Sequence, residues 1–118
     1  MRYMMLLQLD PALMPESGPT PELMEEMGKL IEEMTRAGVL LDTAGLGPLE
    51  QSTRIHLAGG KQTVTDGPFA EAKEFIGGYL LVQAKSKEEA AEWGSRFLAI
   101  HGDEWEFVME IRQVMEAS

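Results

Sequence analysis

The chain of 118 residues has the length of one ordinary domain and can bury a hydrophobic core without disulfides or a structural metal. It contains no cysteine, which excludes disulfides and thiolate metal sites and fits a reducing compartment, so we expect a cytoplasmic protein. The formal net charge of −10 argues against nucleic acid as a partner, because phosphate-binding surfaces need clustered Lys and Arg.

The sequence gives no sign of a membrane span or of a second domain. No apolar run approaches the roughly 18 residues that a membrane-spanning helix needs, so we expect no membrane partner. The sequence also shows no linker, internal repeat or low-complexity tract. We therefore expect a single domain over residues 1–118.

The first third of the chain predicts a strand followed by an amphipathic helix. Residues 3–9 alternate as a strand does, and Asp10-Pro11 ends it. Thr20 is a typical helix N-cap with Pro21 at the first helical position, and Gly38 is expected to end the helix. The apolar residues between them recur at helical spacing and predict one buried stripe, a core rather than a cofactor site: Leu23, Met24, Met27, Leu30, Ile31 and Met34.

The rest of the chain predicts mostly strands, with one more helix. We expect strands over residues 39–46, 52–57, 61–65 and 79–84, the last of them beginning near Phe75. Gly59-Gly60 is a hairpin turn between the second and third of these strands. Ser86 and Glu89 form a capping box that opens the second helix. His101-Gly102-Asp103 then turns the chain into a last strand over residues 105–115.

The resulting order is β-α-β-β-β-β-α-β. With the Gly59-Gly60 hairpin treated as an embellishment, this order predicts an α+β fold of the ferredoxin-like, split βαβ type. Both helices are expected to cover one face of an antiparallel sheet, which leaves the other face open.

Strand alternation assigns side chains to that open face. They are Met4, Leu6, Gln8, Arg54, His56, Val108, Glu110, Arg112 and Val114. Large apolar side chains in such numbers usually mark an interface, so we expect a homodimer in which the two sheets face each other. The alternative is a monomer whose second face is solvated, as antiparallel sheets allow.

Residues 65–79 are the most densely specified stretch. Asp66-Gly67 is a tight-turn pair, Pro68 fixes its own φ, and Phe69 is an apolar anchor behind the turn. The charged residues Glu71, Lys73 and Glu74 follow this turn. Gly77-Gly78 removes side chains where a strand begins, which indicates a bulge or the close approach of another backbone or a ligand.

These residues resemble the signature of the DGPF-domain, YCII-related family, and the likeness extends over nearly the whole chain. Further matches are the opening strand at Tyr3, the Ala37-Gly38 pair, Ser52-Thr53-Arg54, and the closing Glu110-Ile111-Arg112. The usual proline after that arginine is Gln113 here, which concerns how the last strand ends. The resemblance implies a dimeric α+β barrel, in which two ferredoxin-like sheets enclose a cleft.

The resemblance implies a fold but does not imply one activity. Some YCII-related proteins have been proposed as enzymes that use a His-Asp pair in the cleft, and others occur beside or fused to alternative sigma factors. The histidine of that pair belongs near the first helix, where this chain has none, since His56 and His101 are its two histidines. The pair therefore cannot be transferred, and whether the protein is an enzyme stays open.

Two open-face pairs are candidates for ligand binding, each with a structural alternative. Arg54 and His56 form either an anion- or acid-binding pair or an exposed strand histidine beside an arginine. Glu110 and Arg112 are expected to pair with each other, either structurally or around a ligand.

Asp66 has two interpretations. It either meets Lys73 and Arg54 at the mouth of the cleft or caps its own turn. His101 lacks a third metal ligand at useful spacing, and the sequence has no phosphate loop or nucleotide fingerprint, so we expect neither metal nor cofactor.

The sequence thus predicts a homodimer whose inter-sheet cleft binds a small organic molecule. The expected lining is Arg54, His56, Asp66, Lys73, Glu74, Glu110 and Arg112. The alternative is a non-catalytic accessory or regulatory protein associated with sigma-factor-linked transcription control.

Overall fold

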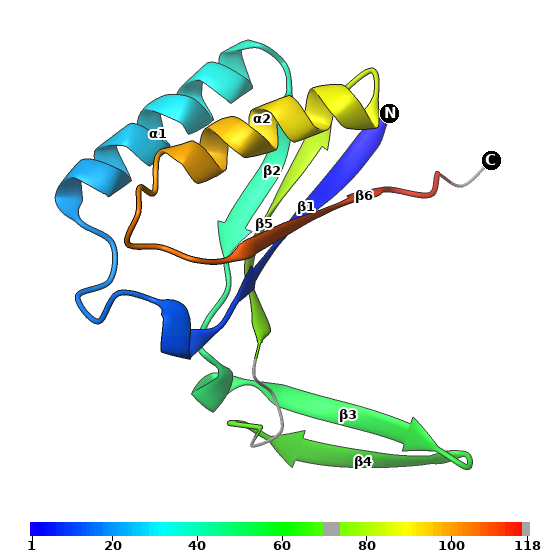
Figure 1. Ribbon diagram of the computed structural model, residues 1–118. Helices are drawn as coiled ribbons and strands as arrows, with labels where there is room; N and C mark the ends of the chain where they lie inside the picture. The colour runs from blue at the N-terminus through cyan, green and yellow to red at the C-terminus, as the bar shows by residue number, and fades with distance from the viewer. Residues whose placement is uncertain (70–73, 117–118) are drawn as a thin grey trace.

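A computed structural model describes residues 1–69 and 74–116 (Figure 1). The chain folds into a four-stranded antiparallel sheet, two helices and a separate two-stranded hairpin. The strands are β1 (Arg2–Leu9), β2 (Leu40–Gly45), β3 (Thr53–Ala58), β4 (Lys61–Asp66), β5 (Phe75–Gln83) and β6 (Val108–Gln113). The helices are α1 (Pro21–Arg36) and α2 (Lys87–Ala99), and single 3-10 turns lie at Pro11–Leu13 and Leu49–Gln51.

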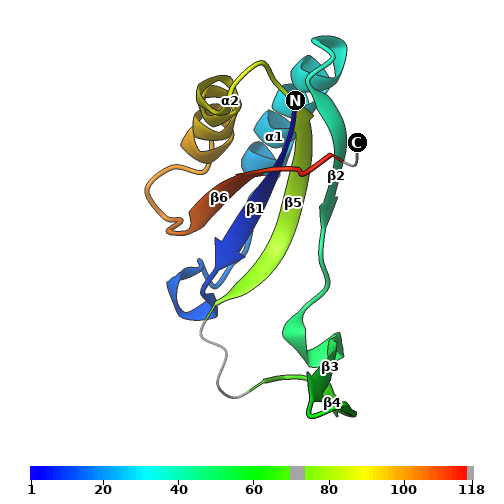
Figure 2. The same cartoon turned by 90° about the vertical axis from the view of Figure 1, so that its right-hand side faces the viewer.

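The four-stranded sheet has the order β2-β5-β1-β6, and each neighbouring pair is antiparallel. Strand β1 is central and pairs with both β5 and β6. In Figure 2 the four strands lie side by side with α1 behind them, so the helices cover one face and leave the other open. The predicted α+β, ferredoxin-like arrangement is confirmed at this level.

The predicted N-caps and the predicted glycine end of α1 are present, but only the serine half of the Ser86–Glu89 capping box forms among the described residues. The Oγ1 atom of Thr20 accepts a hydrogen bond from the Leu23 N–H at 3.1 Å, and Ser86 Oγ accepts from the Glu89 N–H at 3.1 Å. Gly38 has a φ of +74°, and the next N–H, of Val39, donates to the Met34 carbonyl at 2.9 Å. This bond belongs to a Schellman motif, which ends α1. Gly38 has the left-handed backbone conformation that glycine adopts without strain.

The core lies between the helices and the covered face of the sheet. Met5, Met34, Leu80 and Val82 are its most deeply buried large side chains, each at most 1% exposed. Gly94 brings α2 close to β6, because a Cβ there would lie 2.7 Å from the Met109 sulfur. Neither helix combines the length and apolar character that crossing a bilayer requires within the described part of the chain.

The last strand is shorter than predicted. It begins at Val108 rather than at Trp105. Its neighbour within the sheet is β1, which ends at Leu9, and the final pair of that ladder joins Gln8 to Val108. Only Leu9 of β1 lies beyond that pair, so residues 105–107 have almost no strand beside them, and the rings of Trp105 and Phe107 pack on His101 instead.

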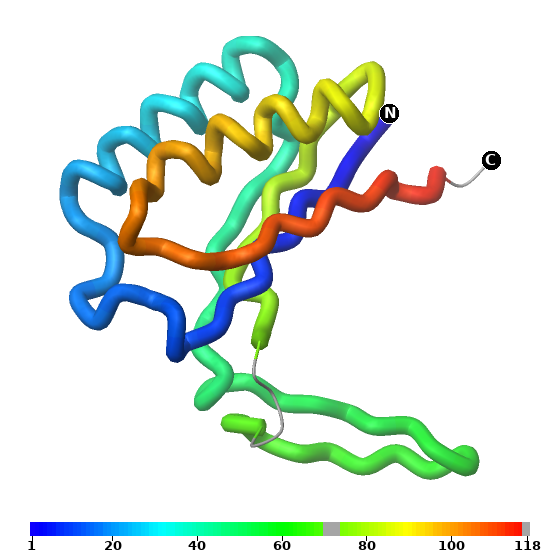
Figure 3. Tube along the Cα trace, in the orientation of Figure 1, coloured from blue at the N-terminus to red at the C-terminus, as the bar shows by residue number. Residues whose placement is uncertain are grey.

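The β3–β4 hairpin projects away from the body of the molecule. The Cα trace in Figure 3 leaves the sheet after β2, follows the hairpin and returns towards β5. Its two strands pair only with each other within the described residues. At the hairpin base the Gly67 N–H donates to the Ser52 carbonyl at 2.7 Å, and a Cβ on Gly67 would overlap the Leu49 carbonyl oxygen. Glycine is therefore required at that turn.

Candidate functional site

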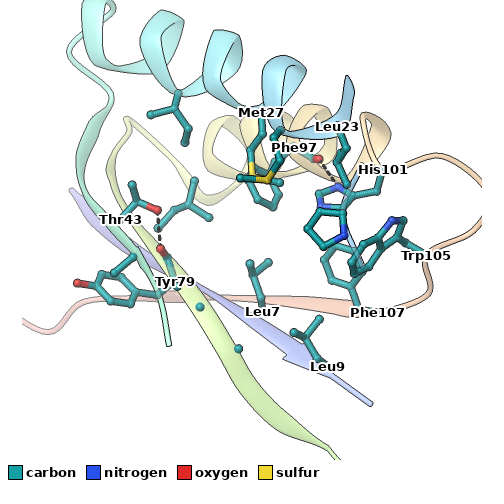
Figure 4. A pocket seen from close by; sticks show the side chains of 18 of the residues that line it. Leu7, Leu9, Leu23, Met27, Thr43, Tyr79, Phe97, His101, Trp105 and Phe107 are labelled. Carbon is teal, nitrogen blue, oxygen red and sulfur yellow. Dashed lines mark hydrogen bonds between the residues drawn. The ribbon is translucent and has the colours of Figure 1, made fainter. Parts of the chain in front are cut away.

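A cavity of about 470 Å³ lies between the covered face of the sheet and the helices (Figure 4). Its walls come from α1, from β1, β2 and β5, and from the segment that follows α2. The lining side chains are mostly aliphatic or aromatic; they include Leu7, Leu9, Leu23, Met27, Ile31, Phe97, Trp105 and Phe107. Of the predicted α1 stripe, Leu23, Leu30 and Met34 are buried, whereas Met24 is 56% exposed. Met27 and Ile31 pack against the core and also line this cavity.

The Gly77-Gly78 pair forms part of the floor. The β1–β5 ladder shifts register between Leu7 and Gln8, opposite this pair, which confirms the predicted bulge. A Cβ on Gly77 would overlap the Leu9 side chain, and one on Gly78 would lie 3.0 Å from the Ala44 carbonyl oxygen. The glycines therefore allow close strand packing and leave this stretch of the cavity without side chains.

Thr43 contributes a hydroxyl beside the cavity, and the hydroxyl hydrogens of Thr43 and Tyr79 are both used in bonds within the protein. Thr43 Oγ1 donates to the Tyr79 carbonyl at 2.8 Å. The Tyr79 hydroxyl donates to Asp42 Oδ2 at 2.8 Å, and this bond raises the pKa of Tyr79. Tyr79 is paired with Leu6, so its ring belongs to the open face.

His101 stands at the edge of the cavity inside an aromatic cluster. The centroids of the Phe97, Trp105 and Phe107 rings lie 5.2, 5.6 and 4.9 Å from that of His101. The Nδ1 atom lies 2.9 Å from the Phe97 carbonyl oxygen. Burial lowers the pKa of His101, because a half-buried imidazolium loses hydration. Near neutral pH the ring is therefore uncharged.

The sequence-based hypothesis missed this site. It considered His101 only as a possible metal ligand and rejected that role, and it assigned Trp105 and Phe107 to a strand. The available signal was local: His101 follows Phe97 by four residues, and two aromatic residues come shortly after the turn at Gly102. Within residues 1–69 and 74–116, no three His, Cys, Asp or Glu side chains are grouped to hold a metal.

Glu110 and Arg112 lie on the open face, as strand alternation predicts. They stand opposite Leu6 and Met4 of β1, respectively. Neither of the two carries an ion pair to any residue in the described ranges. The pairing expected between them is therefore not formed in the single chain.

Arg54 and His56 lie on β3 of the projecting hairpin, outside the four-stranded sheet. The Arg54 guanidinium sits 3.8 Å above the centre of the Phe69 ring, and Phe69 is buried at 8% exposure. Phe69 is thus the anchor that the turn predicts. One chain does not bring Arg54 and His56 together with Glu110 and Arg112 on one sheet.

The remaining predicted residues are spread along the connection between β4 and β5. Asp66 Oδ1 accepts a hydrogen bond from Thr53 Oγ1 at 2.9 Å, which ties the two strands of the hairpin together. Glu74 is exposed just before β5 and borders a shallow hollow beside Gln8. Lys73 lies outside the described residues, as does Glu71.

Comparison with known proteins agrees with the signature at residues 65–79. A model of the YCII-related domain matches residues 1–116. An uncharacterized protein of Rhizobium meliloti (strain 1021), R00369, is 31% identical over 71 residues, which are 60% of this chain and 57% of that relative. The match thus spans little more than half of the relative's length. Because the family model covers almost every residue, the chain belongs to the YCII-related family.

Proposed function

We propose that this protein binds a small, mainly apolar organic molecule in the cavity between its helices and its sheet. The observation that carries the proposal is the cavity itself: about 470 Å³, walled by aliphatic and aromatic side chains. Ligand sites in proteins typically have volumes of roughly 300–1,000 Å³ with a few polar groups among apolar walls. Such a cavity is complete in one chain.

The location differs from the one that strand alternation suggested. The charged candidates Glu110 and Arg112 lie on the opposite face of the sheet, and Arg54 and His56 lie on the hairpin. A cleft lined by all four would need a second chain to bring hairpin and sheet together. The helix-side cavity needs none, so binding there does not depend on the oligomeric state.

The uncharged fluorescent probe N-phenyl-1-naphthylamine tests binding, because its emission rises in an apolar site. Leu7 and Leu6 are neighbours on β1 whose side chains point to opposite faces, the first lining the cavity. Leu7→Trp fills the cavity and is expected to abolish the probe signal, while Leu6→Trp preserves it. Met27→Trp, from α1, fills the same space if Leu7→Trp does not fold.

The outcomes are distinct. Wild-type protein that leaves the probe dark at all concentrations overturns the proposal. So does a signal lost in Leu6→Trp but kept in Leu7→Trp, since the probe would then sit on the open face.

We also propose that two copies associate through the open face. Met4, Leu6 and Leu81 lie there together, and Val108 on the edge strand is 53% exposed. The hairpin adds a second apolar surface: Ile55 stands opposite Val64, and with Leu57 all three are about two-thirds exposed, at 66, 64 and 65%. Apolar surfaces of this kind are typically covered by a partner.

The hairpin differs in charge from the rest of the chain. Arg54 and Lys61 against Asp66 give residues 53–66 a net charge of +1 in a chain of −10, so the remainder carries −11. Two copies repel overall at this net charge, but the weakly positive hairpin can lie against the acidic body of another copy. Light scattering should give twice the chain mass, and Leu6→Arg should convert the dimer to a folded monomer. A wild-type monomer at micromolar concentration contradicts the dimer.

Binding in the cavity is common to an enzyme and to a ligand-responsive regulator. In the regulatory alternative, linked to sigma-factor control, the bound molecule acts as a signal and leaves unchanged. Incubation of a bound compound with catalytic amounts of protein, followed by mass spectrometry, separates the two. Conversion of the compound supports an enzyme, and its recovery intact supports a regulator.

A further inference from the structure

The cavity's few polar groups select among the molecules that could enter it, a property that rests on the binding proposed above. The polar side chains of the lining are few, so each one decides which functional group a ligand needs. Thr43, His101 and Trp105 are the side chains beside the cavity that carry a hydroxyl or a ring nitrogen on its helix side. The protons on these groups determine whether the cavity offers donors or acceptors.

His101 offers an acceptor. The Phe97 carbonyl can only accept a hydrogen bond, so the Nδ1 atom 2.9 Å away must carry the hydrogen. In the uncharged ring the other nitrogen, Nε2, then bears a lone pair. Burial of the ring favours that uncharged form.

The Nε2 atom of His101 is not fully buried. None of the described residues forms a hydrogen bond with it, and the same residues contain no side-chain nitrogen or oxygen that is both fully buried and without a partner. The nitrogen therefore remains accessible. The His101 ring lines the cavity beside Phe107 and Trp105, as Figure 4 shows.

Thr43 offers an acceptor as well. Its hydroxyl hydrogen is used in the bond to the Tyr79 carbonyl, which leaves oxygen lone pairs. The indole N–H of Trp105 is the exception, and Figure 4 draws that nitrogen at the edge of the ring turned away from Leu7. Because His101 Nε2 and Thr43 Oγ1 are acceptors in an otherwise apolar cavity, a ligand that carries a hydrogen-bond donor binds more tightly there.

The shape of the walls adds a second restriction. The Phe97, Trp105 and Phe107 rings surround His101 with interplanar angles of 53, 75 and 71°. Rings in these tilted and edge-on positions give a flat aromatic guest further edge-to-face contacts. We propose that the cavity takes a flat aromatic molecule with one hydroxyl or amine N–H, and that His101 Nε2 receives this hydrogen.

Two probes of almost the same shape test the proposal. 1-Naphthol has the donor and naphthalene lacks it, and both compete with N-phenyl-1-naphthylamine for the cavity. Wild-type protein should bind 1-naphthol about tenfold more tightly than naphthalene, or about 1.4 kcal/mol, the net value of one hydrogen bond. His101→Leu should remove this preference by weakening 1-naphthol alone, and His101→Gln, which keeps an acceptor, should restore part of it.

His56→Leu is the matched variant, since His56 lies on the hairpin. It is expected to keep the tenfold preference, and loss of the preference there would assign recognition to the predicted inter-sheet cleft. Binding of both probes with equal affinity, or a preference that survives His101→Leu, overturns the role of His101 while the cavity remains a binding site. Failure of both probes to bind overturns the proposed function together with this inference.

Discussion

The four-stranded body and the β3–β4 hairpin are built from similar strands, but apolar side chains are buried in the body and exposed in the hairpin. In β5 the apolar residues alternate between a buried set, with Leu80 at 1% and Val82 at 0% exposure, and an open-face set. In the hairpin the same alternation gathers Ile55, Leu57 and Val64 on one face, but every residue of both strands is exposed. Alternation thus reports which side chains share a face, and only the tertiary neighbours decide whether that face is buried.

A truncation in each region tests this contrast and has the largest expected effect. Leu80→Ala removes methyl groups from the core and should lower the free energy of unfolding by about 2–5 kcal/mol. Leu57→Ala removes the same groups from an exposed strand and should change the stability of the monomer by less than about 0.5 kcal/mol. Urea titration of the monomeric Leu6→Arg background measures both. Equal losses would show that the hairpin packs into the body.

Alanine substitutions at Gly67 and Gly47 test how the hairpin is joined to the four-stranded body. A Cβ on Gly67 would overlap the Leu49 carbonyl, so Gly67→Ala must displace the 3-10 turn from the hairpin, at about 1–3 kcal/mol. Gly47→Ala is the control, because a Cβ there would lie 3.7 Å from Gln51 Oε1, an ordinary van der Waals contact. Hydrogen exchange should rise in β3 and β4 of Gly67→Ala and stay unchanged in β1 and β5. Faster exchange throughout the sheet would contradict a separable hairpin.

The two histidines extend the same comparison to pH, with a smaller effect. Burial lowers the pKa of His101, so below its ordinary value of about 6.5 the unfolded chain takes up a proton before the folded chain does. The stability should therefore fall as the pH drops from there towards the lowered pKa. Glu22, Glu26 and Glu104 line a neighbouring hollow with His101 and would favour its cation, but burial dominates.

His101→Leu should flatten this part of the stability profile, and His56→Leu should leave it unchanged. Thermal unfolding between pH 5 and 8 provides the measurement, with wild type and both variants in the same buffers. An unaltered slope in His101→Leu would mean that the ring is hydrated in the folded protein.

Local chemistry made much of the fold predictable. Thr20, Gly38 and Ser86 mark helix ends through bonds to their own neighbours, and Gly77-Gly78 marks a bulge for similar local reasons. The start of β6 was not predictable in this way, because it depends on where β1 ends. A residue far away in the sequence sets that limit.

The candidate site was less predictable than the fold. Glu110 and Arg112 were placed correctly on the open face, since alternation alone assigns them. The cavity depends on the spacing between α1 and the sheet and combines Leu7, Met27 and Phe107 from three distant segments. No short pattern contains that information. Aromatic residues after a helix were read as a strand because their partner, His101, sits in a turn.

Mapping 1-naphthol on the protein by two-dimensional NMR of backbone amides tests most directly whether the ligand site lies on the helix side. The cavity predicts the largest shift changes at Leu7, Thr43, Gly77, Gly78 and Phe107, which surround it. The amides of Arg54, His56, Glu110 and Arg112 should move little. The opposite distribution, with changes concentrated on β3 and β6, would contradict the helix-side site and assign binding to a cleft between two sheets.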